Sequence, residues 1–113
     1  MDQGLGERLF SFAIDTLKFL GTFSQIPEAK IIRYQLAKSS TSSGANYEEA
    51  QAASSRADFA NKIKISLREM RESNYWLRIC KRSDIGDKIL CEELLNESLQ
   101  LKNILGSISS KLK

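Results

Sequence analysis

The sequence predicts an all-α protein, an antiparallel up-down four-helix bundle that forms a single domain over residues 1–113. Apolar residues recur every three or four positions in four long segments, as they do on one face of an amphipathic helix. The alternation of apolar and polar residues that marks a strand is not sustained anywhere in the chain. A chain of 113 residues, 42% of them hydrophobic, is long enough for one modest core.

The first predicted helix, residues 6–22, is apolar around most of its circumference. On a helical wheel its apolar side chains cover an arc of about 220°. They are Leu5, Leu9, Phe10, Phe12, Ala13, Ile14, Leu17, Phe19 and Leu20. Because a surface helix of a small monomer buries a narrower stripe, we expect one face to meet its own bundle and the other to meet a second copy of the chain. The alternative is a central helix in a thick core.

The second predicted helix, residues 28–53, follows Pro27, a residue that suits the start of a helix. It contains the stretch SSTSSGA, residues 39–45, whose composition is typical of a loop. On the helical wheel, however, serines of this stretch fall on the same face as Ile32 and Leu36. We therefore predict one continuous helix that a neighbouring helix approaches closely, with a flexible linker as the alternative.

The third and fourth predicted helices cover residues 56–81 and 85–112. Ser54 and Ser55 are expected to supply the cap of the third helix, and Ser83 or Asp84 that of the fourth, because short polar side chains accept hydrogen bonds from the backbone N–H groups of a first turn. Each helix carries an apolar stripe for the core. These stripes are Phe59, Ile63, Leu67, Met70 and Leu77 in the third helix, and Leu90, Leu94, Leu101, Leu105, Ile108 and Leu112 in the fourth.

A second apolar patch on the third helix is a further candidate contact between copies. It lies to one side of the core stripe of that helix. Together with the outward face of the first helix, this patch forms the predicted oligomer interface. The predicted interface residues are Phe10, Ile14, Leu17, Ile65, Trp76 and Ile79.

A basic stripe on the third helix is the clearest candidate binding site. Its residues project within about 80° of one another on the helical wheel. They are Lys64, Arg68, Arg71, Tyr75, Arg78 and Arg82. Guanidinium groups bind phosphates with two hydrogen bonds and a tyrosine ring stacks on an unpaired base, so the stripe predicts nucleic-acid binding. The alternatives are a solvated helix face, or salt bridges to Glu92, Glu93 and Glu97 of a neighbouring copy.

Composition argues against catalysis and metal binding. The chain has no histidine, which excludes a Ser-His-Asp triad and the common histidine-containing zinc and di-iron sites. The spacing of Cys80 and Cys91 fits no metal site. We expect both thiols to be reduced and half-buried. The alternative is that the two cysteines approach each other across the turn between the last two helices. We expect no enzymatic activity, no metal and no cofactor.

The charge balance and the length of the apolar segments indicate possible partners and the cellular location of the protein. Seventeen basic and fourteen acidic residues give a net charge of +3, which permits nucleic-acid contact without demanding it. The chain shows neither a signal-peptide pattern at its start nor the ~20 consecutive apolar residues of a membrane helix. We therefore expect a cytoplasmic protein with no membrane contact.

Two motifs resemble those of a known family. The run QLAKSSTSSGANYEEA, residues 35–50, resembles the pattern Q-L-x-R-S-x-T-S-x-G-A-N-x-x-E-A. That pattern marks the second helix of the bacterial four-helix bundle proteins first noticed as reading frames in intervening sequences of 23S ribosomal RNA genes. Residues 55–59 and 65–77 match the third-helix patterns S-x-x-D-F and I-x-L-x-E-x-x-E-x-x-Y-W-L of the same family. The chain departs from the family at Lys38, where arginine is common, and at Ser43, where an apolar residue is common.

This resemblance implies a mode of assembly and candidate partners. It implies a ring-shaped homo-oligomer, commonly a homopentamer, although the molecular role of most family members is unknown. Relatives include the accessory variability determinant of diversity-generating retroelements, whose basic ring contacts nucleic acid and a reverse transcriptase. RNA or DNA, and a reverse transcriptase or another protein, are thus candidate partners by analogy. The family carries no known reaction, which implies structural roles for Asn46, Glu49, Glu69 and Glu72.

The sequence therefore predicts a non-enzymatic, self-assembling helical bundle that binds nucleic acid, RNA rather than DNA, through the basic stripe. The alternative is a structural or protein-interaction ring without direct nucleic-acid contact. The two differ in their salt dependence, because binding to phosphates weakens steeply as the salt concentration rises.

Overall fold

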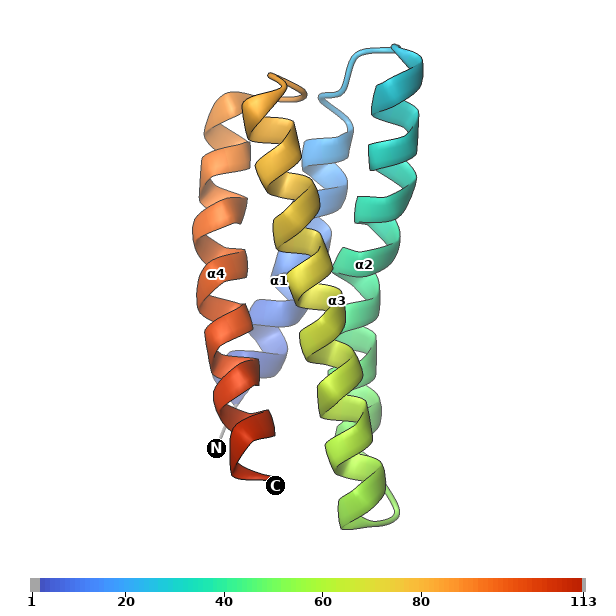
Figure 1. Cartoon of the computed structure of the whole chain (residues 1–113), viewed down its shortest axis with the longest axis vertical. Coiled ribbons are helices and arrows are strands. Elements are labelled where there is room, and N and C mark those ends of the chain that lie inside the picture. Colours follow the sequence, from blue (N-terminus) through green and yellow to red (C-terminus); the bar gives the residue numbers. More distant parts are fainter. Residues whose placement is uncertain (1–2, 113) are drawn as a thin grey trace.

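The computed structural model of the chain describes residues 3–112, which form four α-helices and no strand. The helices are α1 (Gln3–Leu20), α2 (Pro27–Gln51), α3 (Arg56–Arg82) and α4 (Lys88–Lys111). Consecutive helices run in opposite directions, so both chain ends lie at the same end of the bundle (Figure 1). The predicted all-α, up-down four-helix bundle is confirmed. No helix among these residues is both long and apolar enough to cross a membrane.

The four helices pack in a closed square around one core. α1 and α3 each pack against both α2 and α4, whereas across the described residues no Cα atoms of a diagonal pair lie within 8 Å of each other. Every helix contributes fully buried apolar side chains, and each of these stabilises the fold by about 1.5–3 kcal/mol. The largest are Leu9, Phe12, Phe19, Leu36, Ile63, Met70, Leu77, Leu101 and Leu105. Other residues of the predicted stripes lie half-buried at the edge of the core, namely Phe59, Leu67, Leu90, Ile108 and Leu112.

The serine-rich stretch of α2 is helical, which confirms the predicted continuous helix and excludes the linker. Ser39 and Ser43 are fully buried and face Ser73 and Ser66 of α3. The hydroxyl oxygens of Ser39 and Ser73 are 2.8 Å apart and share a hydrogen bond. Because serine side chains are small, the backbones of α2 and α3 can approach closely along this contact. The contact fixes which face of α3 remains exposed.

The predicted cap of α3 is confirmed, and that of α4 is wrong. Ser55 accepts a hydrogen bond from a backbone N–H group in the first turn of α3. α4 begins at residue 88 rather than 85, and its cap is Asp87 rather than Ser83 or Asp84. The reason lies in the turn, where Asp84 and Gly86 adopt positive φ angles of 54° and 82° that interrupt the helical path.

Candidate nucleic-acid interface

The predicted basic stripe forms one exposed line of side chains along α3. The helix is continuous, and the stretch from Lys64 to Arg82 is about 27 Å long at 1.5 Å per residue. Ile63, Met70 and Leu77 lie on the buried face of α3 and pack in the core, so the stripe faces solvent. The structure thus places all six predicted residues on one exposed face: Lys64, Arg68, Arg71, Tyr75, Arg78 and Arg82.

Most cations of the stripe have no carboxylate partner. Among residues 3–112, Arg68 is the one stripe cation in an ion pair, 3.6 Å from Glu69, and its side chain is 70% exposed. Such an exposed ion pair contributes little to the stability of the fold. Glu92 and Glu97, two of the three carboxylates considered as partners in a neighbouring copy, are paired with cations of their own chain. The stripe therefore retains positive charge for an anionic ligand.

A chain of hydrogen bonds holds Arg78 in place. Its Nε donates to Asn74 Oδ1 at 3.0 Å, and Asn74 Nδ2 donates to the hydroxyl of Ser98 on α4 at 2.9 Å. Ser98 is fully buried and donates to the backbone carbonyl of Leu95. The bond to Asn74 uses Nε alone, so both terminal nitrogens of Arg78 can serve a phosphate. The bundle thus orients this guanidinium before any ligand arrives.

The Tyr75 ring lies between two neighbours on the same helix. The guanidinium carbon of Arg78 is 5.7 Å from the centre of the ring, a cation–π distance. The Trp76 ring meets it edge-on, with the two ring centres 5.2 Å apart. Trp76 is fixed in turn, because its Nε1 donates to Glu72 at 3.2 Å. Tyr75 remains 49% exposed, which leaves surface on which an unpaired base can stack.

A cation of α4 that was not predicted lies beside the stripe. Lys102 and Asn103 line a shallow depression of about 550 Å³ between α3 and α4, together with Arg71. The sequence contains a signal for this extension, since no acidic residue follows Glu97. The acid-free end of α4 therefore widens the basic surface of α3.

The predicted interface residues divide into two groups. Phe10, Ile14 and Leu17 of α1 are exposed, Phe10 by 64%, so the alternative of a central helix in a thick core is excluded for the single chain. These three residues line an open groove of about 760 Å³ between α1 and α2. The predicted residues of α3 are half-buried, two of them against the core of their own bundle, and so offer less surface than expected. They are Ile65, Trp76 and Ile79.

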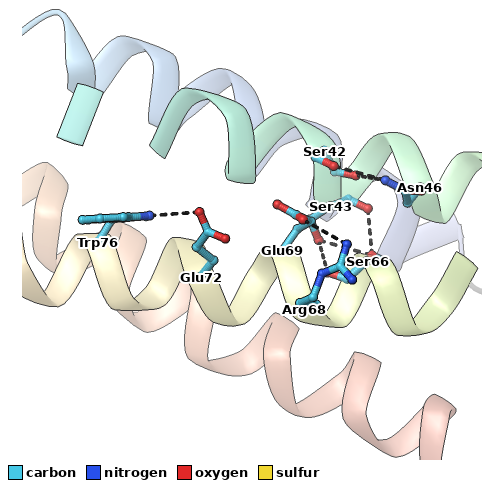
Figure 2. Close-up of polar contacts among 8 residues, drawn as sticks. All are labelled: Ser42, Ser43, Asn46, Ser66, Arg68, Glu69, Glu72 and Trp76. Carbon is cyan, nitrogen blue, oxygen red and sulfur yellow. Dashed lines mark hydrogen bonds and ion pairs between the residues drawn. The ribbon is translucent and has the colours of Figure 1, made fainter. Parts of the chain in front are cut away.

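The polar residues of the family-like motifs make local contacts, which Figure 2 shows. Asn46 Nδ2 donates to the Ser42 carbonyl at 2.9 Å, one turn earlier in α2. On α3, Glu69 pairs with Arg68 and Glu72 accepts from Trp76. These contacts lie within single helices, and those of Asn46 and Glu72 give these two residues structural roles.

The two cysteines are buried more deeply than the half-buried state expected from the sequence. Burial raises the pKa of Cys80 to about 12 and that of Cys91 to about 11, so both thiols are protonated at neutral pH. The Cys91 thiol donates to the Leu77 carbonyl at 3.5 Å. Protonated, buried thiols are poor nucleophiles. Across the described residues, no group of three or more acidic or cysteine side chains could hold a metal ion.

Comparisons with known proteins agree with the motifs. A family model described as 23S rRNA-intervening sequence protein matches residues 5–107. Among solved structures, a protein of unknown function from the S23 ribosomal protein family of Bacteroides thetaiotaomicron is 34% identical to this chain, with a TM-score of 0.77. The similarity covers 93% of this chain and 97% of that one. No curated protein matches the chain.

Proposed function

The chain belongs to the 23S rRNA-intervening sequence protein family, and we propose that it is a non-enzymatic, self-assembling protein that binds nucleic acid along α3. The observation that carries this proposal is the exposed line of cations from Lys64 to Arg82 with Tyr75 among them. Each cation that neutralises a phosphate releases counterions from the nucleic acid, which drives binding.

RNA suits this surface better than duplex DNA. Folded RNA presents unpaired bases in loops and bulges, where aromatic side chains stack on them. The half-exposed ring of Tyr75 suits such stacking, and Arg78 beside the ring and Lys102 next to Arg71 can hold the phosphate backbone. Inside duplex DNA the flat faces of each base pair are covered by the neighbouring base pairs, so Tyr75 would contribute less to the affinity for duplex DNA.

Self-assembly is the second part of the proposal. The exposed apolar side chains of α1, Phe10, Ile14 and Leu17, support it, because large apolar side chains gathered on one surface mark contact sites. A ring of identical copies, a homopentamer by analogy with the family, is the assembly we propose. Such a ring repeats the basic stripe once per copy, which strengthens binding to a long nucleic acid through multivalency.

One alternative function is favoured by a specific observation. The open groove between α1 and α2 is lined mainly by apolar residues. An apolar groove is typical of protein–protein contact, so the assembly could serve as a scaffold that meets a protein partner, such as a reverse transcriptase, without touching nucleic acid.

Fluorescence anisotropy with labelled structured RNA and labelled duplex DNA distinguishes the two functions. The salt concentration is raised from about 50 to about 200 mM, and the nucleic-acid proposal predicts a ten- to thousandfold loss of affinity over that range. Tighter binding to the structured RNA supports the RNA preference. An absence of binding even at about 50 mM salt would reject the nucleic-acid role and favour the scaffold.

A further inference from the structure

The groove between α1 and α2 has a defined shape. Leu9, Phe10 and Ala13 of α1 and Gly44 and Ala45 of α2 form its apolar part. The helices come so close at the glycine that a Cβ there would lie 3.4 Å from the Cβ of Leu9. The lining of α1 extends from residue 6 to 17, which corresponds to a length of about 16 Å.

The charged residues of this groove are all acidic. Glu7 of α1 and Glu48 of α2 line it, and no lysine or arginine does. Within residues 3–112 neither carboxylate has an ion-pair partner. In addition, α2 contains no cation from Ser39 to its end at Gln51. An apolar groove with unpaired carboxylates favours an occupant that is both apolar and basic.

The first half of α2 carries a surface of this kind. Ile31 and Tyr34 are 63% and 66% exposed, which is unusual for large apolar side chains. Lys30 and Lys38 lie one turn before and one turn after Tyr34, on the same side of the helix, and are exposed. Neither lysine forms an ion pair with another described residue. These four residues, the basic face of α2, extend over about 12 Å, so they fit the length of the groove.

Three other large exposed apolar residues outside the groove, Tyr75, Ile89 and Leu99, are less suited to it. Ile89 of α4 is accompanied by Glu92 and Glu93, whose charges would oppose the acidic groove. Tyr75 of α3 and Leu99 of α4 are the lone large apolar side chains exposed on their respective stretches of surface. The basic face of α2 combines two adjacent apolar side chains with two unpaired cations.

We propose that the groove between α1 and α2 binds the basic face of α2 from a second copy of the chain. This inference rests on the proposed self-assembly and specifies its contact. Ile31 and Tyr34 enter the apolar part of the groove, and the positive charge of the basic face is attracted to the two carboxylates, which lie at the end of the groove where Gly6 meets Tyr47. Because the groove and the basic face are different surfaces, each copy both receives and provides a contact, which is the head-to-tail arrangement from which closed rings are built.

Charge reversal in two separate variants tests this pairing. One variant carries Glu7→Lys and Glu48→Lys, and the other carries Lys30→Glu and Lys38→Glu. Each variant alone places like charges across the contact, so its self-association, measured by sedimentation velocity, should weaken by about tenfold or more. Combining all four substitutions in one chain restores opposite charges at every contact of the ring, and this chain should assemble.

A matched control and the chain with all four substitutions make the result decisive. Lys88→Glu with Lys111→Glu makes the same charge change on exposed positions of α4 and should self-associate like the wild type. Rescue in the chain with all four substitutions separates a lost contact from a lost fold, because that chain carries every substitution of the two variants. If the wild type assembles and the reversed variants do so equally well, or the chain with all four substitutions stays dissociated, the groove pairing is wrong while self-assembly stands. A wild-type chain that is monomeric at micromolar concentration overturns both.

Discussion

Ser43 of α2 and Ser66 of α3 donate hydrogen bonds to each other's backbone carbonyl oxygens. The Ser43 hydroxyl lies 2.8 Å from the Ser66 carbonyl oxygen, and the Ser66 hydroxyl lies 2.7 Å from that of Ser43. Both side chains are fully buried. This reciprocal pair joins α2 to α3 and thereby holds the exposed basic stripe of α3 in its orientation.

Substitutions at Ser43 should reveal how closely the two helices approach. Ser43→Ala removes one buried hydrogen bond and should lower the free energy of unfolding by about 1 kcal/mol. Ser43→Leu must also push the backbones apart and should lower it further, by about 1–3 kcal/mol more. Urea denaturation measures both, with the exposed Ser110→Ala as the control. A Ser43→Leu variant as stable as the wild type would contradict the close contact.

Substituting alanine for each of two glycines should change the stability of the fold in opposite directions. A Cβ at Gly86 would lie 2.6 Å from Cε1 of Phe19, and the backbone there has a φ of +82°. Gly86→Ala should therefore destabilise the fold by more than about 2 kcal/mol. Gly106 lies within α4 and a Cβ there meets nothing within 4 Å, so Gly106→Ala should stabilise the fold by up to about 1 kcal/mol. Thermal unfolding of the two variants checks this, and the same sign for both would refute the turn geometry.

The buried thiols predict a loss of stability at alkaline pH. Burial raises the pKa of Cys80 to about 12 and of Cys91 to about 11, from an ordinary value of 9.0. The unfolded chain therefore releases these protons first as the pH rises. Their contribution to stability is complete below pH 9 and declines as the pH approaches the pKa values of the folded state.

A double variant isolates this contribution from that of lysines and tyrosines. The urea midpoint should fall between about pH 8 and about pH 10.5 in the wild type, and fall less in Cys80→Ala with Cys91→Ala. An equal fall in both proteins would show that the thiols do not cause the loss.

Tyr75 should contribute to RNA affinity by stacking rather than by charge. Tyr75→Ala should weaken binding to an RNA with unpaired loop bases by about 1–3 kcal/mol, without changing the salt dependence. Tyr75→Phe keeps the ring and should bind like the wild type. Anisotropy titrations of a hairpin RNA and of a fully paired duplex measure the effect. An equal loss of affinity for the duplex would argue against stacking on an unpaired base.

The faces of the helices could be predicted from the sequence, whereas their ends could not. Periodicity alone places Ile63 and Met70 on one side of α3 and Arg71 on another, and the structure agrees. The start of α4 depends on the turn at Gly86, which packs on Phe19 from the other end of the sequence. A local sequence pattern cannot reveal a contact between residues so far apart in the chain, so the predicted cap of α4 was wrong.

Packing between helices explains the remaining differences at the site. Lys102 belongs to the basic surface because α4 lies beside Arg71, and a helical wheel of α3 alone cannot contain it. Trp76 and Ile79 lie on the same side of the helical wheel of α3. Whether that side packs against the core of its own bundle or against a second copy depends on how α3 crosses the neighbouring helices.

The salt dependence of RNA binding with and without two stripe cations tests the nucleic-acid role most directly. Arg71→Gln with Arg78→Gln removes two charges, and glutamine at 78 keeps an amide donor for Asn74. The slope of log affinity against log salt concentration should become shallower by about 1.5, with lower affinity throughout. Lys18→Gln with Lys111→Gln, the same charge change on other helices, should leave the slope unchanged. If the slope and affinity of the stripe variant equal those of the wild type, α3 is not the binding surface.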